Sequence, residues 1–465
     1  MNKALDLLLN SRRIDLISKY LYIKNPTNNY FKEVYLAFIN AFNGFLETPN
    51  GENYTKQSKE DFLNSFNELY ASISKNGFNE RKSIPIHNGE ICDGAHRLAV
   101  CAVLNIDITR TDIGEQPKIY DYKFFQKKRI DTCYLDFCAL EYVKLNPNAY
   151  IVNLHAVNNP QQDKKVEEIL EKYGFIYYKK DVHLSFNGYV NIKKLSYGFD
   201  NWGEKSWIGS AKNNYAGAQR HAKKSFGLGK NPLRAFIFVC KNFDNVLKAK
   251  AEIRDIYKIG NESVHINDTR KEAIELAQTY FNDNSISMFN ARPFNIDTPT
   301  LDEYLKELKL EAINQNTNIE NICATGSSPM AVYALREIKD FDYLIEDTTN
   351  FHPQNNNISE HDGVWLSYYP LNKRVIIENP QFHFYYKGVK FITLDILKKM
   401  KKKRNEIPKD IKDIKLIEKI EQGKFKYNKL KFMLPKFIKK YKYGRKRTIT
   451  IFNLIKISYK KKIVN

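Results

Sequence analysis

Short runs of β-branched and aromatic residues alternate with segments of helical spacing through the middle of the chain. The runs AYIVNLHAV (149–157), YGFIYYKKDVHLSF (173–186) and LRAFIFVC (233–240) are typical of strands. The segments VEEILEKYG (166–174) and TRKEAIELAQTYF (269–281) instead repeat apolar residues at helical intervals. This alternation predicts an α/β fold, in which helices cover the faces of a sheet.

The 465 residues are enough for several cores, and the pattern predicts an α/β (α+β multidomain) chain. Four parts are expected, with soft boundaries. They are a helical N-terminus with a strand-turn-helix unit at 1–117, a central α/β unit at 118–317, a C-terminal unit at 318–423 and a basic aromatic tail at 424–465.

The net charge of +21 is concentrated near the C-terminal end. From Lys398 onward, 25 Lys and Arg oppose 5 Asp and Glu, a net of +20, which leaves +1 for the preceding 397 residues. Lysines interleaved with aromatic and Ile residues favour an anionic leaflet, which we expect to be the inner face of the cytoplasmic membrane. Nucleic acid is a less favoured partner, and a merely solvated end is the third interpretation.

The six cysteines include no C-x-x-C pair, which argues against a zinc site and a disulfide framework. Reduced thiols in the cytoplasm are therefore expected. No run approaches the roughly 18 apolar residues of a spanning helix. The predicted location is cytoplasmic, with membrane contact at most peripheral.

The sharpest local pattern joins the turn Gly326-Ser327-Ser328, after the strand-like ICAT, to Asp340 and Asp342. Two carboxylates two positions apart on a strand share a face and can bind Mg²⁺. A Gly-Ser turn at a helix start offers amides and hydroxyls to phosphate oxygens. The pattern predicts a site for a metal and a phosphate, and the alternative is that the aspartates are solvated acids at a strand edge.

This spacing resembles the nucleotidyltransferase superfamily, whose pattern is an apolar residue, Gly-Ser, a spacer and then Asp-apolar-Asp. The basic helix expected from Ile396 to Arg404 and the following KDIKDI (409–414) are similar to the helical end of small nucleotidyltransferase domains. The resemblance implies that Asp340 and Asp342 are catalytic metal ligands for Mg²⁺. It implies that the Gly-Ser turn holds the phosphates of a nucleotide or nucleotide-activated donor.

The same resemblance implies a third carboxylate from a later strand. The sequence offers Glu378 in RVIIEN for this role and, less favourably, Asp362.

A second pattern, DGAHR at 93–97, follows a predicted hairpin around Asn88-Gly89 and opens an apolar helix. Asp93, Gly94, His96 and Arg97 would combine free amides, a helix N-terminus and a guanidinium fork, an arrangement that binds phosphate. The segment resembles the ParB/sulfiredoxin-like fold, which binds nucleotide phosphates and includes a free-serine kinase. Because Ala95 stands where sulfiredoxin has its reactive cysteine, redox chemistry is not expected. A purely structural turn is the alternative.

A weaker candidate lies in SVHINDT (263–269), where a strand would place His265 and Asn267 on one face before Asp268. The Asp268-Thr269 pair would equally suit a helix cap.

Together these segments resemble proteins of bacterial capsule and lipopolysaccharide gene clusters. We therefore expect a Mg²⁺-dependent nucleotidyl or phosphoryl transferase in surface polysaccharide biosynthesis, with a nucleotide and a phosphorylated or sugar substrate. One alternative is a ParB/sulfiredoxin-fold small-molecule kinase. The other is a non-catalytic protein that binds nucleotides or nucleic acid.

Overall fold

The computed structural model describes residues 3–47, 55–114, 119–198, 207–346 and 350–425, and the backbone of three strands within 438–460. The described chain is mixed α/β, as the sequence predicts. It divides into two compact units. Unit 1 comprises Met1–Ile208, Ala216–Asn290 and Arg374–Lys390, and unit 2 comprises Gly209–Tyr215, Ala291–Lys373 and Phe391–Asn465.

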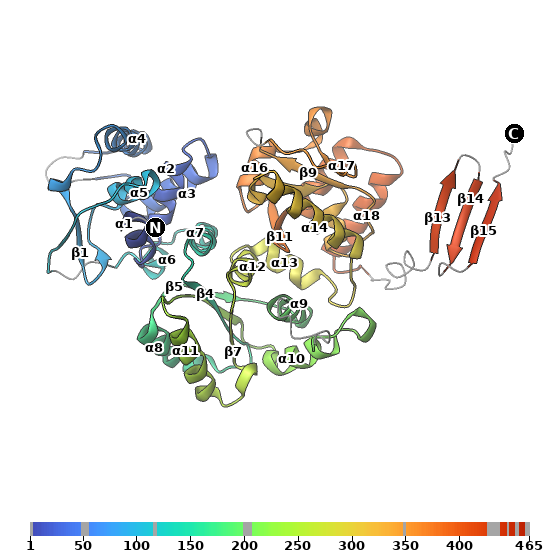
Figure 1. The fold of residues 1–465 in the computed structure, drawn as a ribbon, viewed down its shortest axis with the longest axis horizontal. Coiled ribbons are helices and arrows are strands. Elements are labelled where there is room, and N and C mark those ends of the chain that lie inside the picture. The colour runs from blue at the N-terminus through green and yellow to red at the C-terminus, as the bar shows by residue number, and fades with distance from the viewer. Residues whose placement is uncertain are drawn as a thin grey trace. The chain divides into compact units, whose positions relative to one another are not determined.

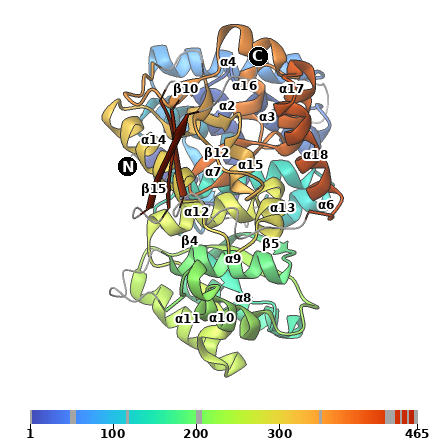
Figure 2. The same ribbon diagram turned by 90° about the vertical axis from the view of Figure 1, so that its right-hand side faces the viewer.

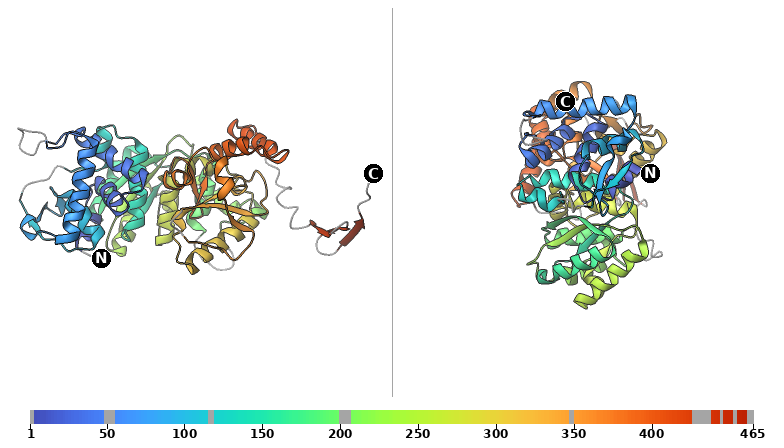
Figure 3. Two further views of the ribbon diagram at one scale, coloured as in Figure 1. Left: turned by 90° about the horizontal axis from the view of Figure 1, so that it is seen from above. Right: turned by 90° about the vertical axis from the view of Figure 1, so that its left-hand side faces the viewer.

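The N-terminal part of unit 1 is a helical bundle, coloured blue in Figure 3, with a small sheet. The apolar helix α5 contacts α1, α2 and α4. Strand β1 pairs antiparallel with β2 and parallel with β3. The bounds are α1 (Lys3–Leu9), α2 (Asp15–Lys24), α3 (Asn29–Asn43), α4 (Lys59–Asn76), β1 (Ile84–His87), β2 (Glu90–Ile91), α5 (Ala95–Leu104) and β3 (Arg110–Asp112).

The central part of unit 1 is built on a sheet with strand order β5-β6-β4-β7. Strand β4 pairs antiparallel with both β6 and β7, and β5 pairs antiparallel with β6. The bounds are α6 (Tyr122–Lys127), α7 (Thr132–Leu145), β4 (Ala149–Leu154), α8 (Asp163–Tyr173), β5 (Phe175–Val182), α9 (Phe186–Tyr197), α10 (Ala216–Phe226), β6 (Leu233–Val239), α11 (Phe243–Tyr257), β7 (Val264–Ile266), α12 (Arg270–Tyr280) and α13 (Asp283–Ala291).

Helices cover both faces of this central sheet. Helices α8 and α11 pack together on one face, whereas α12 packs on β4 from the other (Figures 1 and 2). The side chains agree with this layering, because Arg234 of β6 binds Asp163 of α8 at 2.9 Å, while Lys180 of β5 binds Asp136 of α7 at 2.5 Å. The sheet is thus the middle layer that the alternating sequence pattern predicts.

Unit 2 contains strands in the order β10-β9-β8-β12, with β8 antiparallel to β9 and β9 parallel to β10. Strands β11 and β12 are joined by Lys387 and Gly388, both at positive φ, as in a two-residue hairpin turn. The bounds of these later elements are α14 (Pro299–Asn314), β8 (Ile322–Thr325), α15 (Ser328–Val332), β9 (Phe341–Ile345), β10 (Ile358–Glu360), α16 (Lys373–Glu378), β11 (His383–Tyr386), β12 (Val389–Ile392), α17 (Leu394–Arg404) and α18 (Lys409–Glu421).

Part of the basic tail forms an antiparallel sheet of order β13-β14-β15. These strands are β13 (Ile438–Tyr443), β14 (Lys446–Ile451) and β15 (Ile455–Lys460). The tail side chains lie outside the described residues, so its membrane and nucleic-acid roles stay predictions. In the part of the chain that is described, no helix combines the length and apolarity needed to cross a membrane.

A buried group of charges anchors α2 within unit 1. The Asp15 carboxylate binds Arg13 at 2.8 Å and Lys19 at 2.5 Å, and all three side chains are buried. Burial opposes ionisation of Asp15, but the two cations outweigh it, so the pKa of Asp15 is held well below its ordinary value. The carboxylate offsets the free-energy cost of burying the two cations.

We predict that Asp15→Ala lowers the free energy of unfolding by about 3–5 kcal/mol, because it leaves two buried cations without their partner. Urea unfolding followed by circular dichroism measures this loss. Asp107→Ala, which removes an exposed acid 3.9 Å from Lys3, is the control and should cost less than about 1 kcal/mol. Equal losses in the two variants would contradict the prediction.

Candidate functional site

The strands of unit 2 gather polar residues on one face of their sheet. Asp342 of β9 is the register partner of Thr325 on β8 and of Ser359 on β10. Side chains of directly paired residues project to the same face. His361 follows Ser359 by two positions and its ring also reaches Asp342. Three neighbouring strands therefore place Thr325, Asp342, Ser359 and His361 in one polar cluster, called the Asp342 cluster below.

Asp342 lies directly against the glycine of the Gly-Ser turn. A Cβ added at Gly326 would stand 1.9 Å from Oδ2 of Asp342, and Gly326 has φ +61°. A side chain at this position would therefore meet both a steric clash and an unfavourable backbone conformation. The glycine brings the turn and the carboxylate into contact, as the predicted metal and phosphate site requires.

Asp342 is half-buried and its charge is supported by neighbours. Nε2 of His361 lies 3.5 Å from Oδ2, and Oγ of Ser359 donates to Oδ1 at 3.4 Å. Burial alone would raise the pKa of Asp342, but the hydrogen bond and charge of His361 outweigh it, so the pKa lies below its ordinary value. The side chain keeps 18% of its exposure, so an ionised carboxylate remains open to a ligand.

His361 is fixed by further contacts. Its Nδ1 lies 2.8 Å from the Tyr369 hydroxyl, which is 2.7 Å from the Thr325 hydroxyl. The ring stacks on Trp365 with centroids 4.9 Å apart, and the Arg404 guanidinium lies 5.5 Å from the Trp365 ring. These contacts hold the imidazole in one orientation toward Asp342.

The serines of the turn are the second half of the site. The hydroxyls of Ser327 and Ser328 are buried and have no hydrogen-bond partner among the described residues. Buried polar atoms are normally paired, so two orphaned hydroxyls in one turn need an explanation. A ligand that offers oxygen acceptors would satisfy them.

The helix after the turn is short. Helix α15 ends at Val332, and Ala334 has φ +54°. A helix of one turn has a weak dipole. Phosphate binding here would therefore depend on hydroxyls and amides rather than on a long helix.

The other two predicted catalytic acids are placed differently. Asp340 is exposed and precedes β9, which begins at Phe341, so it is not a strand residue. Glu378 ends helix α16 in unit 1, not a strand, and accepts a hydrogen bond from Arg374 at 2.6 Å. Their catalytic roles stay predictions.

The acids of KDIKDI have structural partners. Asp410 binds Arg404 at 2.5 Å and Asp413 binds Lys401 at 2.9 Å, and both carboxylates are buried. Arg336 also donates to Asp413 at 3.1 Å. This segment therefore joins α17 to α18 and orients Arg404 beneath Trp365.

The residues of DGAHR make contacts of their own within unit 1. The His96 ring packs edge-on against Phe66 at 4.6 Å, and its Nε2 lies 3.1 Å from the Tyr35 hydroxyl. Burial, together with nearby positive charges, lowers the pKa of His96 well below its ordinary value. His96 is therefore neutral and faces aromatic rings.

Arg97 donates to the backbone carbonyl oxygens of Lys82 and Ser83, and its guanidinium lies 3.9 Å from exposed Asp93. A Cβ at Gly94, which has φ +79°, would meet this guanidinium at 2.9 Å. These contacts agree with the structural alternative for DGAHR, and its phosphate role stays a prediction.

A cavity of about 510 Å³ borders the same hairpin. It is lined by the hairpin turn Asn88-Gly89 and by Glu90, together with Arg12, Arg110 and residues of the central sheet. Asp93, His96 and Arg97 are not among its described lining residues.

The weaker candidates in SVHINDT also have partners. Nε2 of His265 lies 2.5 Å from Oε1 of Glu272, and Oδ1 of Asn267 accepts from the Ile151 amide at 2.6 Å. Asp268 binds Lys250 at 3.3 Å. Thr269 caps α12 by accepting from the Glu272 amide, which confirms the capping alternative.

The polar cluster around Asp342 includes residues that the sequence alone does not single out. His361 carries little weight in the sequence, because a lone histidine is more often structural. Tyr369 and Trp365 have no motif. The short run ISE at 358–360 gives no clear strand signal, and only the pairing of β10 beside Asp342 in the fold brings Ser359 and His361 to the site.

The donor set suits Mg²⁺ only with help from a substrate. Among the described residues, no group of three His, Cys, Asp or Glu is placed to hold a metal. Magnesium commonly binds through one or two carboxylates together with substrate phosphates and water. The Asp342 carboxylate, set against a Gly-Ser turn whose two serine hydroxyls have no partner among the described residues, fits that arrangement. No protein-family model matches the chain, and no curated protein or solved structure matches it either.

We predict that Gly326→Ala lowers the free energy of unfolding by about 2 kcal/mol, because the new methyl group displaces the Asp342 carboxylate. Gly363→Ala is the matched control. Gly363 also has positive φ, at +50°, but an added Cβ there meets nothing within 4 Å. Chemical unfolding of both variants separates the clash from backbone strain, and equal losses would contradict the proposed contact.

We predict that His96 makes folding sensitive to acid. Because its pKa is lowered in the folded state, the unfolded chain takes up a proton first. The contribution of His96 to the free energy of unfolding is fully present above about pH 6.5, the ordinary pKa of histidine in the unfolded chain. It falls as the pH is lowered, by about 1.4 kcal/mol between pH 7.5 and pH 5.5. In urea unfolding, His96→Gln should reduce the pH difference by this amount. Phe62→Leu, a packing change at a buried position of α4, should leave the difference as in the wild type.

Proposed function

We propose that the protein is a Mg²⁺-dependent nucleotidyl or phosphoryl transferase whose active site is the Asp342 cluster of unit 2. The observation that carries the proposal is the contact between an ionised, half-buried carboxylate and a Gly-Ser turn with two unpaired buried hydroxyls. A carboxylate binds a cation and the hydroxyls bind phosphate oxygens, so the cluster suits a metal-bound polyphosphate.

Each residue has a distinct task in this proposal. Asp342 would hold Mg²⁺, with exposed Asp340 as a second carboxylate. Ser327 and Ser328 would donate to phosphate oxygens, and His361 would keep Asp342 ionised and oriented. When bound, Mg²⁺ supplies neutralisation of the phosphate charge. Positioning and charge neutralisation are the main requirements of phosphoryl and nucleotidyl transfer.

The donor is proposed to be a nucleotide or a nucleotide-activated compound, and the acceptor a phosphorylated or sugar substrate. The setting in surface polysaccharide biosynthesis rests on the sequence resemblance to capsule-cluster proteins. The small-molecule kinase alternative is less favoured, because Arg97 is engaged by backbone carbonyls and His96 by aromatic rings.

We predict that Asp342→Asn lowers Mg²⁺-dependent turnover at least about 100-fold, because the neutral amide keeps the shape but cannot neutralise a cation. Phosphorus NMR of nucleoside triphosphates and nucleotide sugars, mixed with phosphorylated and unphosphorylated sugars, gives the readout. Asp395→Asn removes an exposed acid of α17, and it should retain wild-type turnover.

Turnover within twofold of wild type in Asp342→Asn would remove the transferase proposal. Nucleotide turnover that survives this change but is abolished by Arg97→Ala would instead favour the kinase alternative.

A further inference from the structure

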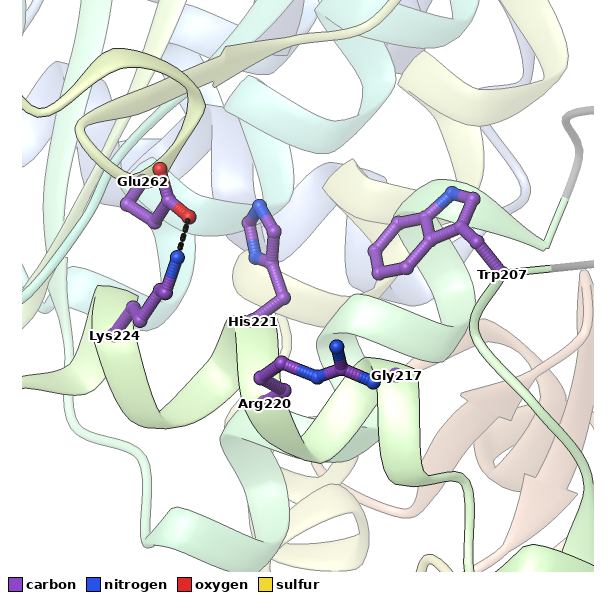
Figure 4. A pocket seen from close by; sticks show the side chains of 6 residues that line it. All are labelled: Trp207, Gly217, Arg220, His221, Lys224 and Glu262. Atoms are coloured by element: carbon purple, nitrogen blue, oxygen red, sulfur yellow. Dashed lines mark hydrogen bonds and ion pairs between the residues drawn. The ribbon is translucent and has the colours of Figure 1, made fainter.

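One face of helix α10 in unit 1 lines a cavity that none of the sequence patterns predicts. Gly217, Arg220, His221 and Lys224 recur at intervals of three and four, so they share a helix face. With Trp207 and Glu262 they surround a cavity of about 210 Å³. Figure 4 shows His221 between the Lys224–Glu262 pair and the Trp207 indole.

The aromatic wall is held in place by the helix backbone. A Cβ at Gly217 would stand 1.8 Å from the carbonyl oxygen of Trp207, and the Ala218 amide donates to the Ile208 carbonyl oxygen at 3.1 Å. The glycine lets the chain at Trp207 lie directly on α10. The indole packs 5.6 Å from His221 and 5.0 Å from Tyr197, yet it remains 43% exposed. A flat apolar surface is therefore open to a ligand.

The charged residues of the wall favour an anion. Lys224 is paired with Glu262 at 3.1 Å, whereas Arg220 is exposed and has no ion pair with a described residue. The lining therefore carries an excess positive charge, which is located on Arg220. A guanidinium binds phosphate through two parallel hydrogen bonds and is well suited to this role.

His221 is a neutral hydrogen-bonding group in this wall. Burial lowers the pKa of His221 to about 3, and Lys193 and His265 add to the effect. Its Nδ1 lies 3.3 Å from the Ser225 hydroxyl. The ring can therefore offer a hydrogen bond to a ligand hydroxyl without contributing a charge.

A buried pair behind His221 keeps this wall rigid. Nζ of Lys193 lies 2.7 Å from Nε2 of His155, and the His155 ring contacts the His221 ring at 6.4 Å. Burial lowers the pKa of both Lys193 and His155 well below their ordinary values. The rings of Tyr189 and Tyr197 enclose the amine at 5.6 and 5.7 Å. The interior side of His221 is thus closely packed, and the exposed guanidinium of Arg220 lies outside it.

We propose that the α10 cavity binds a phosphorylated monosaccharide, with the phosphate on Arg220 and the sugar ring against Trp207. A volume of about 210 Å³ lies below the roughly 300–1,000 Å³ of sites for drug-sized ligands, so the cavity favours a ligand smaller than a complete nucleotide. His221 and Glu262 provide hydrogen-bonding groups for ring hydroxyls. This site is separate from the Asp342 cluster, and the proposal does not depend on the transferase activity.

Isothermal titration calorimetry with glucose 1-phosphate as the probe tests the proposal, with glucose and inorganic phosphate as comparison ligands. The full chain should bind glucose 1-phosphate more tightly than either comparison ligand. Arg220→Ala should weaken binding about 10- to 100-fold, because a charged hydrogen bond is lost. Trp207→Ala should weaken it about tenfold by removing the stacking surface.

Lys223→Ala is the matched control, because Lys223 is an exposed cation of α10 that does not line the cavity. It should bind as the wild type does, and so should Asp342→Asn, which separates this proposal from the transferase proposal. Arg220 and Trp207 are both exposed, and unchanged circular dichroism would confirm that their variants fold.

Three results would overturn the proposal. They are no binding of glucose 1-phosphate at millimolar concentration, equal binding by Arg220→Ala and wild type, and inorganic phosphate binding as tightly as the sugar phosphate. The last result would show that the Trp207 wall contributes nothing to recognition.

Discussion

The contact between the Asp342 carboxylate and Gly326 is the constraint on which the candidate active site depends. The absence of a side chain at Gly326 lets β9 bring its acid against the turn after β8. The same contact places a negative charge against the turn that also contains Ser327 and Ser328, whose buried hydroxyls have no partner among the described residues. His361, Tyr369 and Trp365 then limit the positions available to the carboxylate. The backbone at Gly326 therefore sets the position of the carboxylate, and the packing of the aromatic rings around His361 keeps it there.

Unit 1 contains two kinds of environment for buried charged groups, one around Asp15 and one around Lys193. At Asp15 one buried carboxylate binds both Arg13 and Lys19, so each cation has a negatively charged partner, although burial still lowers the pKa of Lys19. At Lys193 no carboxylate of a described residue is in hydrogen-bond contact, and the amine instead meets an imidazole and two tyrosine rings. Burying an unpaired charge is costly, which is why the pKa of Lys193 falls. The first arrangement gives each buried cation a carboxylate partner, whereas the second forms a packed wall behind the α10 cavity.

The sequence was sufficient where local chemistry decides the structure. Strand β6 lies within the predicted run LRAFIFVC, and α5 begins after Gly94, which adopts the positive φ that glycine tolerates. Ser58 and Asp61, three positions apart, form a capping box at the start of α4. Each of these features is set by neighbours in the chain, so a local pattern contains the necessary information.

The sequence was insufficient where distant segments decide the outcome. His361 reaches Asp342 because β10 pairs with β9, and no local pattern specifies that pairing. His96 occupies a helix start that suits phosphate, yet its ring contacts Phe66 of α4. The α10 cavity depends on the Trp207 carbonyl lying on Gly217. The two proposed sites also differ in the sign of their charge, since one presents the ionised Asp342 and the other the Arg220 guanidinium, which has no ion pair with a described residue. The difference arises because the fold determines which charged side chains pair with each other. A count of charges along the chain does not contain that information.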